Sequence, residues 1–132
     1  MHGYAAREIF TEAEQALASR VSNLVALSPY DIDGEPVRCH ELVRAVGEEL
    51  GLSWADGWFG MVEHSWLWTR AWLPLEPIPN ILDPYVPGRL PQTQLIHTGS
   101  HVLPLDYRRG DYRKDIRWPV ITHLRNLMRS AA

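Results

Sequence analysis

The chain has 132 residues, a mass of 15.1 kDa and a formal net charge of -3, from 13 basic and 16 acidic side chains. This length supports one hydrophobic core, so we expect a single domain over residues 1–132. No apolar run reaches the roughly 20 residues that a membrane-spanning helix needs. The small negative charge argues against a dedicated nucleic-acid binder.

The first residues and the cysteine content narrow the setting. Arg7 and Glu8 stand where a secretory signal would begin its apolar stretch, so we expect a cytoplasmic protein or one exported without a cleaved signal. Cys39 is the only cysteine, which excludes an intramolecular disulfide and a multi-cysteine zinc site. The six tryptophans fit a buried core and a substrate groove equally well.

Two amphipathic helices are predicted in the first half of the chain. Apolar residues recur at spacings of three and four over residues 11–27, where Thr11 and Glu14 form a capping-box pattern. The second helix is expected over residues 36–50, because proline suits the first position of a helix and Gly51 would close it.

The position of the cysteine follows from the loop between the two predicted helices and from the apolar face of the second helix. Residues 30–36 are expected to form a loop with a turn at Asp33 and Gly34. In the helix, the thiol of Cys39 falls on the apolar face and points inward, whereas His40 lies off that face. The other residues of the apolar face are Leu42, Val43, Val46 and Leu50.

Aromatic residues after Leu52 indicate strands. The clearest strand covers residues 62–72 and should be central or near-central in a sheet. One of its faces carries His64, Trp66, Trp68, Arg70 and Trp72, and the other carries Ser65, Leu67, Thr69 and Ala71.

The rest of the chain favours short strands and a final helix. Seven of the ten prolines lie between Pro74 and Pro104, so this stretch can hold only short strands such as Ile81–Leu82 and Leu95–His97. Apolar residues at helical spacing predict a helix over residues 120–129, with Pro119 near its start. No internal repeat and no second domain are indicated.

Three residues are candidates for one catalytic site: Cys39 near a helix start, His64 on the following strand and Asp83 at the end of the next. The positive end of a helix dipole favours the thiolate form of a cysteine. A histidine beside it would move the proton, and a carboxylate on the other ring nitrogen would fix the tautomer. His64 follows Cys39 by 25 residues and Asp83 follows His64 by 19, spacings that a helix, a turn and a hairpin can close.

Each of these residues also has a purely structural explanation. A lone cysteine on an apolar helix face is commonly a small buried hydrophobe, a histidine before a tryptophan is commonly a core residue, and Asp-Pro is a common turn former. The joint order and spacing, rather than any single residue, carry the catalytic hypothesis.

A resemblance to a known superfamily rests on the same segments. The sequence Glu63-His64-Ser65-Trp66, followed by Ile81-Leu82-Asp83-Pro84-Tyr85, resembles the histidine and acid motifs of the transglutaminase-like, papain-like cysteine protease superfamily. Arg38-Cys39-His40-Glu41-Leu42 stands where that superfamily has its nucleophile helix, although Arg38 and His40 replace the small residues that usually flank the cysteine. The similar region covers roughly residues 33–86. It implies Cys39 as nucleophile, His64 as general base and then acid, and Asp83 as the orienting group.

Stabilisation of an oxyanion would need backbone or side-chain donors near Cys39. Its own backbone N–H is one candidate, because amides of a first helical turn have no partner within the helix. The candidates for a second donor are Tyr30, Asn80 and Trp58. The negative charges of Asp31, Asp33 and Glu35 would oppose a thiolate unless Arg38 or His64 offsets them.

Other possible sites are weaker. His97 and His101 are four residues apart, but Thr98-Gly99-Ser100 between them indicates a turn, so we expect no metal site. The segment Arg108–Trp118 is basic with interleaved aromatics, and its aspartates favour a solvated loop or a protein-contact surface over phosphate binding. The Pro-rich stretch Leu73–Pro91 is a candidate rim that sets substrate choice.

We therefore expect an α+β domain with a papain-like or transglutaminase-like fold, in which N-terminal helices pack on a short antiparallel sheet and a C-terminal helix closes one side. The expected function is a thiol-dependent hydrolase or acyltransferase. It would act on an amide, ester or thioester through Cys39, His64 and Asp83, without a cofactor or metal. A Trp-rich surface would favour a peptide or protein substrate, or an aromatic acyl group.

Two alternatives remain open. A non-catalytic member of the same fold would bind a protein partner through exposed tryptophans and would tolerate Cys39→Ala. A nucleic-acid contact protein would use Arg108–Trp118 and bind in a strongly salt-dependent way, and this is the less favoured alternative.

Overall fold

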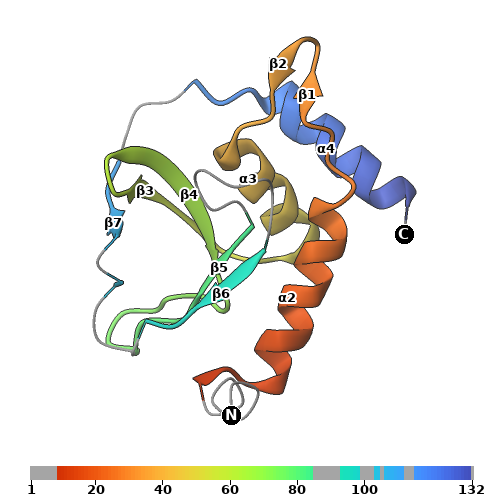
Figure 1. Cartoon of the computed structure of the whole chain (residues 1–132). Helices are drawn as coiled ribbons and strands as arrows, with labels where there is room; N and C mark the ends of the chain where they lie inside the picture. Colours follow the sequence, from red (N-terminus) through yellow and green to blue (C-terminus); the bar gives the residue numbers. More distant parts are fainter. Residues whose placement is uncertain (1–8, 85–92, 99–102, 105, 112–114, 132) are drawn as a thin grey trace.

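The computed structural model describes residues 9–84, 93–98, 103–104, 106–111 and 115–131 (Figure 1). Tyr85, His101 and residues 112–114 lie outside this part, as do Arg7 and Glu8. The helices and strands in chain order are α2 (Glu12–Val25), β1 (Asp31–Ile32), β2 (Glu35–Pro36), α3 (Cys39–Leu50), β3 (Trp54–Phe59), β4 (Val62–Trp68), β5 (Ile81–Asp83), β6 (Gln94–Ile96), β7 (Tyr107–Arg109) and α4 (Trp118–Ser130).

The two outer helices agree with the sequence prediction. Helix α2 starts at the N-cap Thr11, whose side chain and that of Glu14 form the expected capping box. Helix α4 has Pro119 in its first turn and buries Ile121, Leu124 and Met128. Among the described residues, no helix is long and apolar enough to cross a membrane.

The main sheet is antiparallel, with the strand order β6-β5-β4-β3-β7. The prediction of a central strand is confirmed by β4, which pairs with β3 from Val62 to Leu67. The strand ends at Trp68 rather than Trp72, because the chain bends at Thr69 and Arg70 and leaves the ladder. The architecture is therefore α+β, as expected.

Helix α3 lies in the middle of the molecule, between the sheet on one side and α2 and α4 on the other (Figure 1). Its residues 40–47 are all buried, so the helix has no solvent-facing side over this stretch. The prediction that His40 lies off the buried face is wrong for this reason, since His40 is 2% exposed. Gly47 permits the close approach to β3, because a Cβ there would lie 2.6 Å from a ring carbon of Trp54.

The helix starts three residues later than predicted. Residues 31–36 form a hairpin in which β1 pairs with β2, so Pro36 ends a strand and does not open a helix. The hairpin turn has positive φ values of 54° at Asp33 and 81° at Gly34, which suits the two-residue turns that join antiparallel strands. Cys39 consequently becomes the first helical residue, next to the N-cap Arg38.

The two faces of the sheet bury different side chains. An aliphatic cluster lies on the α3 side and an aromatic cluster lies on the other. The aliphatic cluster includes Val21, Val25, Leu42, Val43, Val46, Leu67, Leu82, Ile121, Leu124 and Met128. The aromatic cluster is Ala55, Trp66, Trp68, Ile81 and Tyr107, with Phe59, Trp72, Ile78, Ile96 and Leu103 packed against it.

The tryptophans are mainly core residues. Trp66 and Trp68 are 0% and 3% exposed, whereas Trp118 at 49% is the exposed one among the six. Trp54, Trp58 and Trp72 are half-buried, so the described surface is not rich in fully exposed indoles, and the use of tryptophan in binding stays a prediction.

Candidate functional site

The fold brings Cys39, His64 and Asp83 together. The Nε2 atom of His64 lies 2.7 Å from Oδ2 of Asp83, and the two side chains are 1% and 0% exposed. Cys39 lies close enough to the same imidazole to raise its pKa. Because Nε2 faces the carboxylate, Nδ1 is the ring nitrogen left for the thiol. The arrangement has the order thiol, imidazole, carboxylate that the sequence predicts for this trio.

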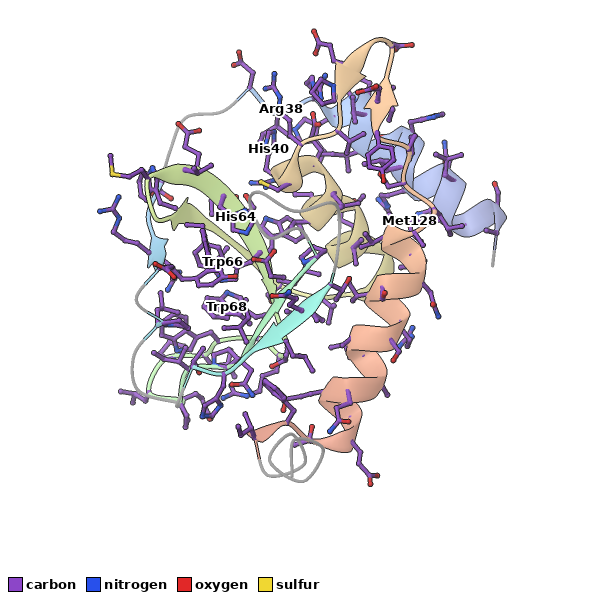
Figure 2. The ribbon with its side chains drawn as sticks, viewed as in Figure 1. Arg38, His40, His64, Trp66, Trp68 and Met128 are labelled. Atoms are coloured by element: carbon purple, nitrogen blue, oxygen red, sulfur yellow. The ribbon has the colours of Figure 1, made fainter. Side chains whose placement is uncertain are left out.

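Three separate elements position these residues. Cys39 begins α3, His64 is the third residue of β4 and Asp83 is the last residue of β5. In the described ladder, β5 pairs with β4 only at Leu67 and Trp68, so the two strands are not paired alongside His64. Figure 2 shows His64 next to the first turn of α3, followed along β4 by Trp66 and Trp68.

The imidazole of His64 is held in its charged form. Burial lowers the pKa of His64, but the hydrogen bond to Asp83, the neighbouring Cys39 and the negative charge of Asp83 outweigh burial and raise the pKa to about 9. His64 is therefore an imidazolium at neutral pH. A buried imidazolium requires counter-charge to be stable, and the Asp83 carboxylate supplies it.

Tyr107 is part of this cluster and was not predicted from the sequence. Its hydroxyl donates a hydrogen bond of 2.5 Å to Oδ2 of Asp83. Its ring makes edge contacts with Phe59 and Trp66, at centroid distances of 5.1 and 5.2 Å. The sequence carried no signal for this contact, because Tyr107 precedes a basic segment and meets Asp83 only through the curl of the sheet.

The acidic residues near the first turn of α3 are balanced by Arg117, the N-cap of α4. Arg117 donates from Nε and Nη2 to the two carboxylate oxygens of Glu41, at 2.5 and 2.6 Å. It also pairs with Glu35 of the hairpin. Burial raises the pKa of Glu41, but Arg117 and the backbone N–H of Arg38 bring it below the usual 4.5. The cation that offsets Glu35 is thus Arg117, which the sequence analysis had not considered.

The predicted oxyanion donors have different surroundings in the structure. In the part of the chain described, no acceptor receives the backbone N–H of Cys39, which is free to bind an oxyanion. The amide of Asn80 donates to Glu14 and accepts from the backbone N–H of Thr98, which holds this side chain in place. Tyr30 is 64% exposed and lines a pocket of about 250 Å³ beside Val37 and Leu42.

The other candidate sites were the histidine pair His97 and His101 and the basic segment Arg108–Trp118. His97 is exposed and its ring contacts Phe10 at 6.3 Å. The described residues contain no group of three metal-ligating side chains. The basic segment is not a solvated loop throughout, because Arg108 belongs to β7 and its guanidinium covers the ring of Trp58 at 4.9 Å.

Comparisons of the chain with models of known protein families, with curated proteins and with solved structures find no match.

Proposed function

We propose that the protein carries out thiol-based acyl chemistry at Cys39, with His64 and Asp83 as its partners. The observation that supports this most directly is the setting of the His64 ring, which has Asp83 bonded to Nε2 and Cys39 close enough to raise its pKa. A thiol at the first residue of a helix, next to an imidazolium, is the environment in which thiolates form and act as nucleophiles.

In the proposed reaction, the sulfur of Cys39 attacks the carbonyl carbon of an amide, ester or thioester. The carbon–sulfur bond forms, and the oxyanion is bound by the backbone N–H of Cys39. His64 gives its proton to the leaving group as the bond to that group breaks, which leaves an acyl-enzyme. Water or an amine then attacks the acyl carbon, His64 takes the proton of this nucleophile, and the thiol group is released.

The fold we propose at the finer level is papain-like or transglutaminase-like. Three features support this: a nucleophile at the start of a central helix, a histidine on the central strand and an acid at the end of the next strand. The resemblance of residues 38–42, 63–66 and 81–85 to the superfamily motifs agrees with this proposal. The proposed substrate is a peptide or protein.

Alkylation with iodoacetamide against pH tests the thiol–imidazole pair directly, because every modified thiol is Cys39. A free cysteine titrates at roughly 8.5 and reacts slowly well below that pH. We expect Cys39 to react readily at pH about 6. In His64→Gln, which keeps a side-chain amide to contact Asp83, the rate at this pH should fall by about tenfold or more. His97→Gln, at an exposed histidine, is the matched control and should react like the wild type.

Acyl transfer is tested with p-nitrophenyl acetate. We expect mass spectrometry of the intact protein to show one acetyl group, absent from Cys39→Ala, and its release to be accelerated by added amine if transfer competes with hydrolysis. A thiol that is slow and unaffected by His64→Gln, together with no acetyl adduct, would contradict the proposal. The non-catalytic binding module would then be the better hypothesis.

A further inference from the structure

Tyr107 reaches the site from the opposite part of the sheet. It lies on the edge strand β7, which pairs with β3, whereas Asp83 lies on β5 on the other side of β4. The hydroxyl of Tyr107 nevertheless bonds to the Asp83 carboxylate. Two strands lie between β7 and β5, about 14 Å in a flat sheet, so the sheet must curl to bring Tyr107 and Asp83 together across the aromatic face.

One oxygen of Asp83 accepts from two donors. Oδ2 receives Nε2 of His64 at 2.7 Å and the hydroxyl of Tyr107 at 2.5 Å. All three side chains are buried, with Tyr107 at 5% exposure and Asp83 at 0%. A hydrogen bond to a carboxylate stabilises its negative charge. The hydrogen bond from Tyr107 therefore weakens the stabilisation that Asp83 gives to the imidazolium of His64.

We propose that Tyr107 is a positioning residue of the Cys39 site, which holds the Asp83 carboxylate in place and moderates its hold on the His64 proton. This inference rests on the proposed acyl chemistry, in which His64 must release a proton to the leaving group. A carboxylate that lacked the Tyr107 hydrogen bond would retain that proton more firmly and slow this step, whereas the carboxylate bonded to both groups still orients the ring.

The surroundings of His64 make Tyr107 the natural residue for this role. Within the described ranges, the charged or titratable groups that face the imidazole are Asp83 from β5, Cys39 from α3 and Tyr107 acting through Asp83 from β7. The neighbour from β3 is the uncharged ring of Phe59, at a centroid distance of 6.1 Å. Burial and the charges of Asp83 and Asp106 raise the pKa of Tyr107, so its hydroxyl stays a donor.

The direct test is an NMR titration of the His64 ring in the wild type and in Tyr107→Phe, with the His64 signal assigned by its loss in His64→Gln. Phenylalanine keeps the ring contacts with Phe59 and Trp66 and removes only the hydroxyl. We expect the midpoint of His64 to move above its wild-type value in Tyr107→Phe. Tyr30→Phe removes the same group at an exposed position and should leave the midpoint unchanged. An unchanged or lowered midpoint in Tyr107→Phe would overturn the inference.

Kinetics then separate this inference from the proposed function. Phenyl acetate has a poorer leaving group than p-nitrophenyl acetate, so its acyl transfer depends more on the His64 proton. We expect Tyr107→Phe to slow phenyl acetate by at least about threefold more than p-nitrophenyl acetate, with iodoacetamide alkylation within about twofold of wild type. Equal slowing of both esters would overturn the moderating role. If the wild type forms no acetyl adduct, the proposed function fails, while the titration still decides whether Tyr107 moderates His64.

Discussion

The two faces of the central sheet are built from different chemistry. On the side of α3, Leu67 and Leu82 join an aliphatic cluster, and the charged groups Arg44 and Asp56 form an ion pair of 2.8 Å near its edge. On the opposite side, aromatic rings surround His64 and Asp83, which are almost completely buried. Adjacent residues of one strand, Trp66 and Leu67, therefore point into different environments.

The two faces therefore contribute differently to the stability of the fold and to the candidate site. Burial of aliphatic side chains stabilises the fold in proportion to the area removed from water. Buried charges do not share that advantage, because their desolvation is costly unless they are paired with good geometry. Helix α3 also buries the paired charge of Glu41, but the pair of His64 and Asp83 differs because it lies beside the Cys39 thiol, which supports a functional role for the aromatic face.

The largest expected effect is a loss of stability caused by a substitution in the aliphatic cluster alone. Leu67 is 0% exposed, and Leu67→Ala should lower the free energy of unfolding by about 3 kcal/mol, through lost burial and the cavity that remains. Urea unfolding measures this loss. The titration midpoint of His64, followed by NMR, should stay at its wild-type value because Leu67 points away from the imidazole. A shifted midpoint would show that the two faces are not independent.

The second expected effect is confined to the aromatic face and depends on pH. The folded pKa of His64 is about 9, above its ordinary value of 6.5. The imidazolium therefore stabilises the native state fully below about pH 6.5, and this contribution is lost as the pH rises through about 9. Its size is on the order of 3 kcal/mol. Urea unfolding from pH 6 to 10 should show the decline.

His64→Gln is the control for this decline, since its stability curve should be flatter over the same pH interval. Leu67→Ala should give a curve parallel to that of the wild type, only lower. A wild-type curve that does not fall above neutral pH, or a His64→Gln curve that falls as steeply, would contradict the charged state assigned to His64.

The sequence predicted the scaffold well and the central helix less well. Local signals were sufficient for α2, where Thr11 and Glu14 form the expected capping box, and for β4 as the central strand. The start of α3 was misplaced because Asp33 and Gly34 encode a hairpin turn, and Pro36 fits a short edge strand as well as a helix start. The spacing of apolar residues also gave a wrong prediction for His40. Such spacing identifies one buried face of a helix, whereas α3 is covered on several sides.

The candidate site was predictable only where motifs carried it. Cys39, His64 and Asp83 stand in short segments with a recognisable order, and the structure brings them together. Tyr107 and Arg117 have no such signal, because their partners Asp83 and Glu41 are 24 and 76 residues distant in sequence. Contacts of this range depend on sheet curvature and helix docking, which composition and spacing do not encode.

A third test removes the ion pair between Arg117 and Glu41, next to the first turn of α3. Glu41 is 0% exposed and its charge is compensated by Arg117, whose side chain is 23% exposed. Arg117→Gln should therefore lower the free energy of unfolding by about 2 kcal/mol, because it leaves a buried carboxylate without its cation. Chemical unfolding at pH 7 measures the loss. Arg129→Gln removes an arginine that is 56% exposed in its ion pair, and a loss as large as that of Arg117→Gln would contradict the special role of the Glu41 pair.

The smallest expected effect concerns the charge next to the nucleophile. Arg38 is exposed and directly precedes Cys39, and its guanidinium forms no ion pair with any carboxylate among the described residues. Such a cation should attract a negatively charged reagent to the thiol. We expect Arg38→Gln to lower the ratio of the iodoacetate rate to the iodoacetamide rate by about threefold at low salt, since exposed charges interact weakly in water.

Two comparisons make this last effect specific. Added salt should reduce the ratio in the wild type and change it little in Arg38→Gln, because screening acts on the charge that the variant lacks. Arg20→Gln should preserve the wild-type ratio, since Arg20 lies with Leu50 at the far end of α3. If Arg38→Gln left the ratio unchanged, the thiol would be insensitive to its nearest exposed cation. Its reactivity would then depend on the buried groups of the aromatic face alone.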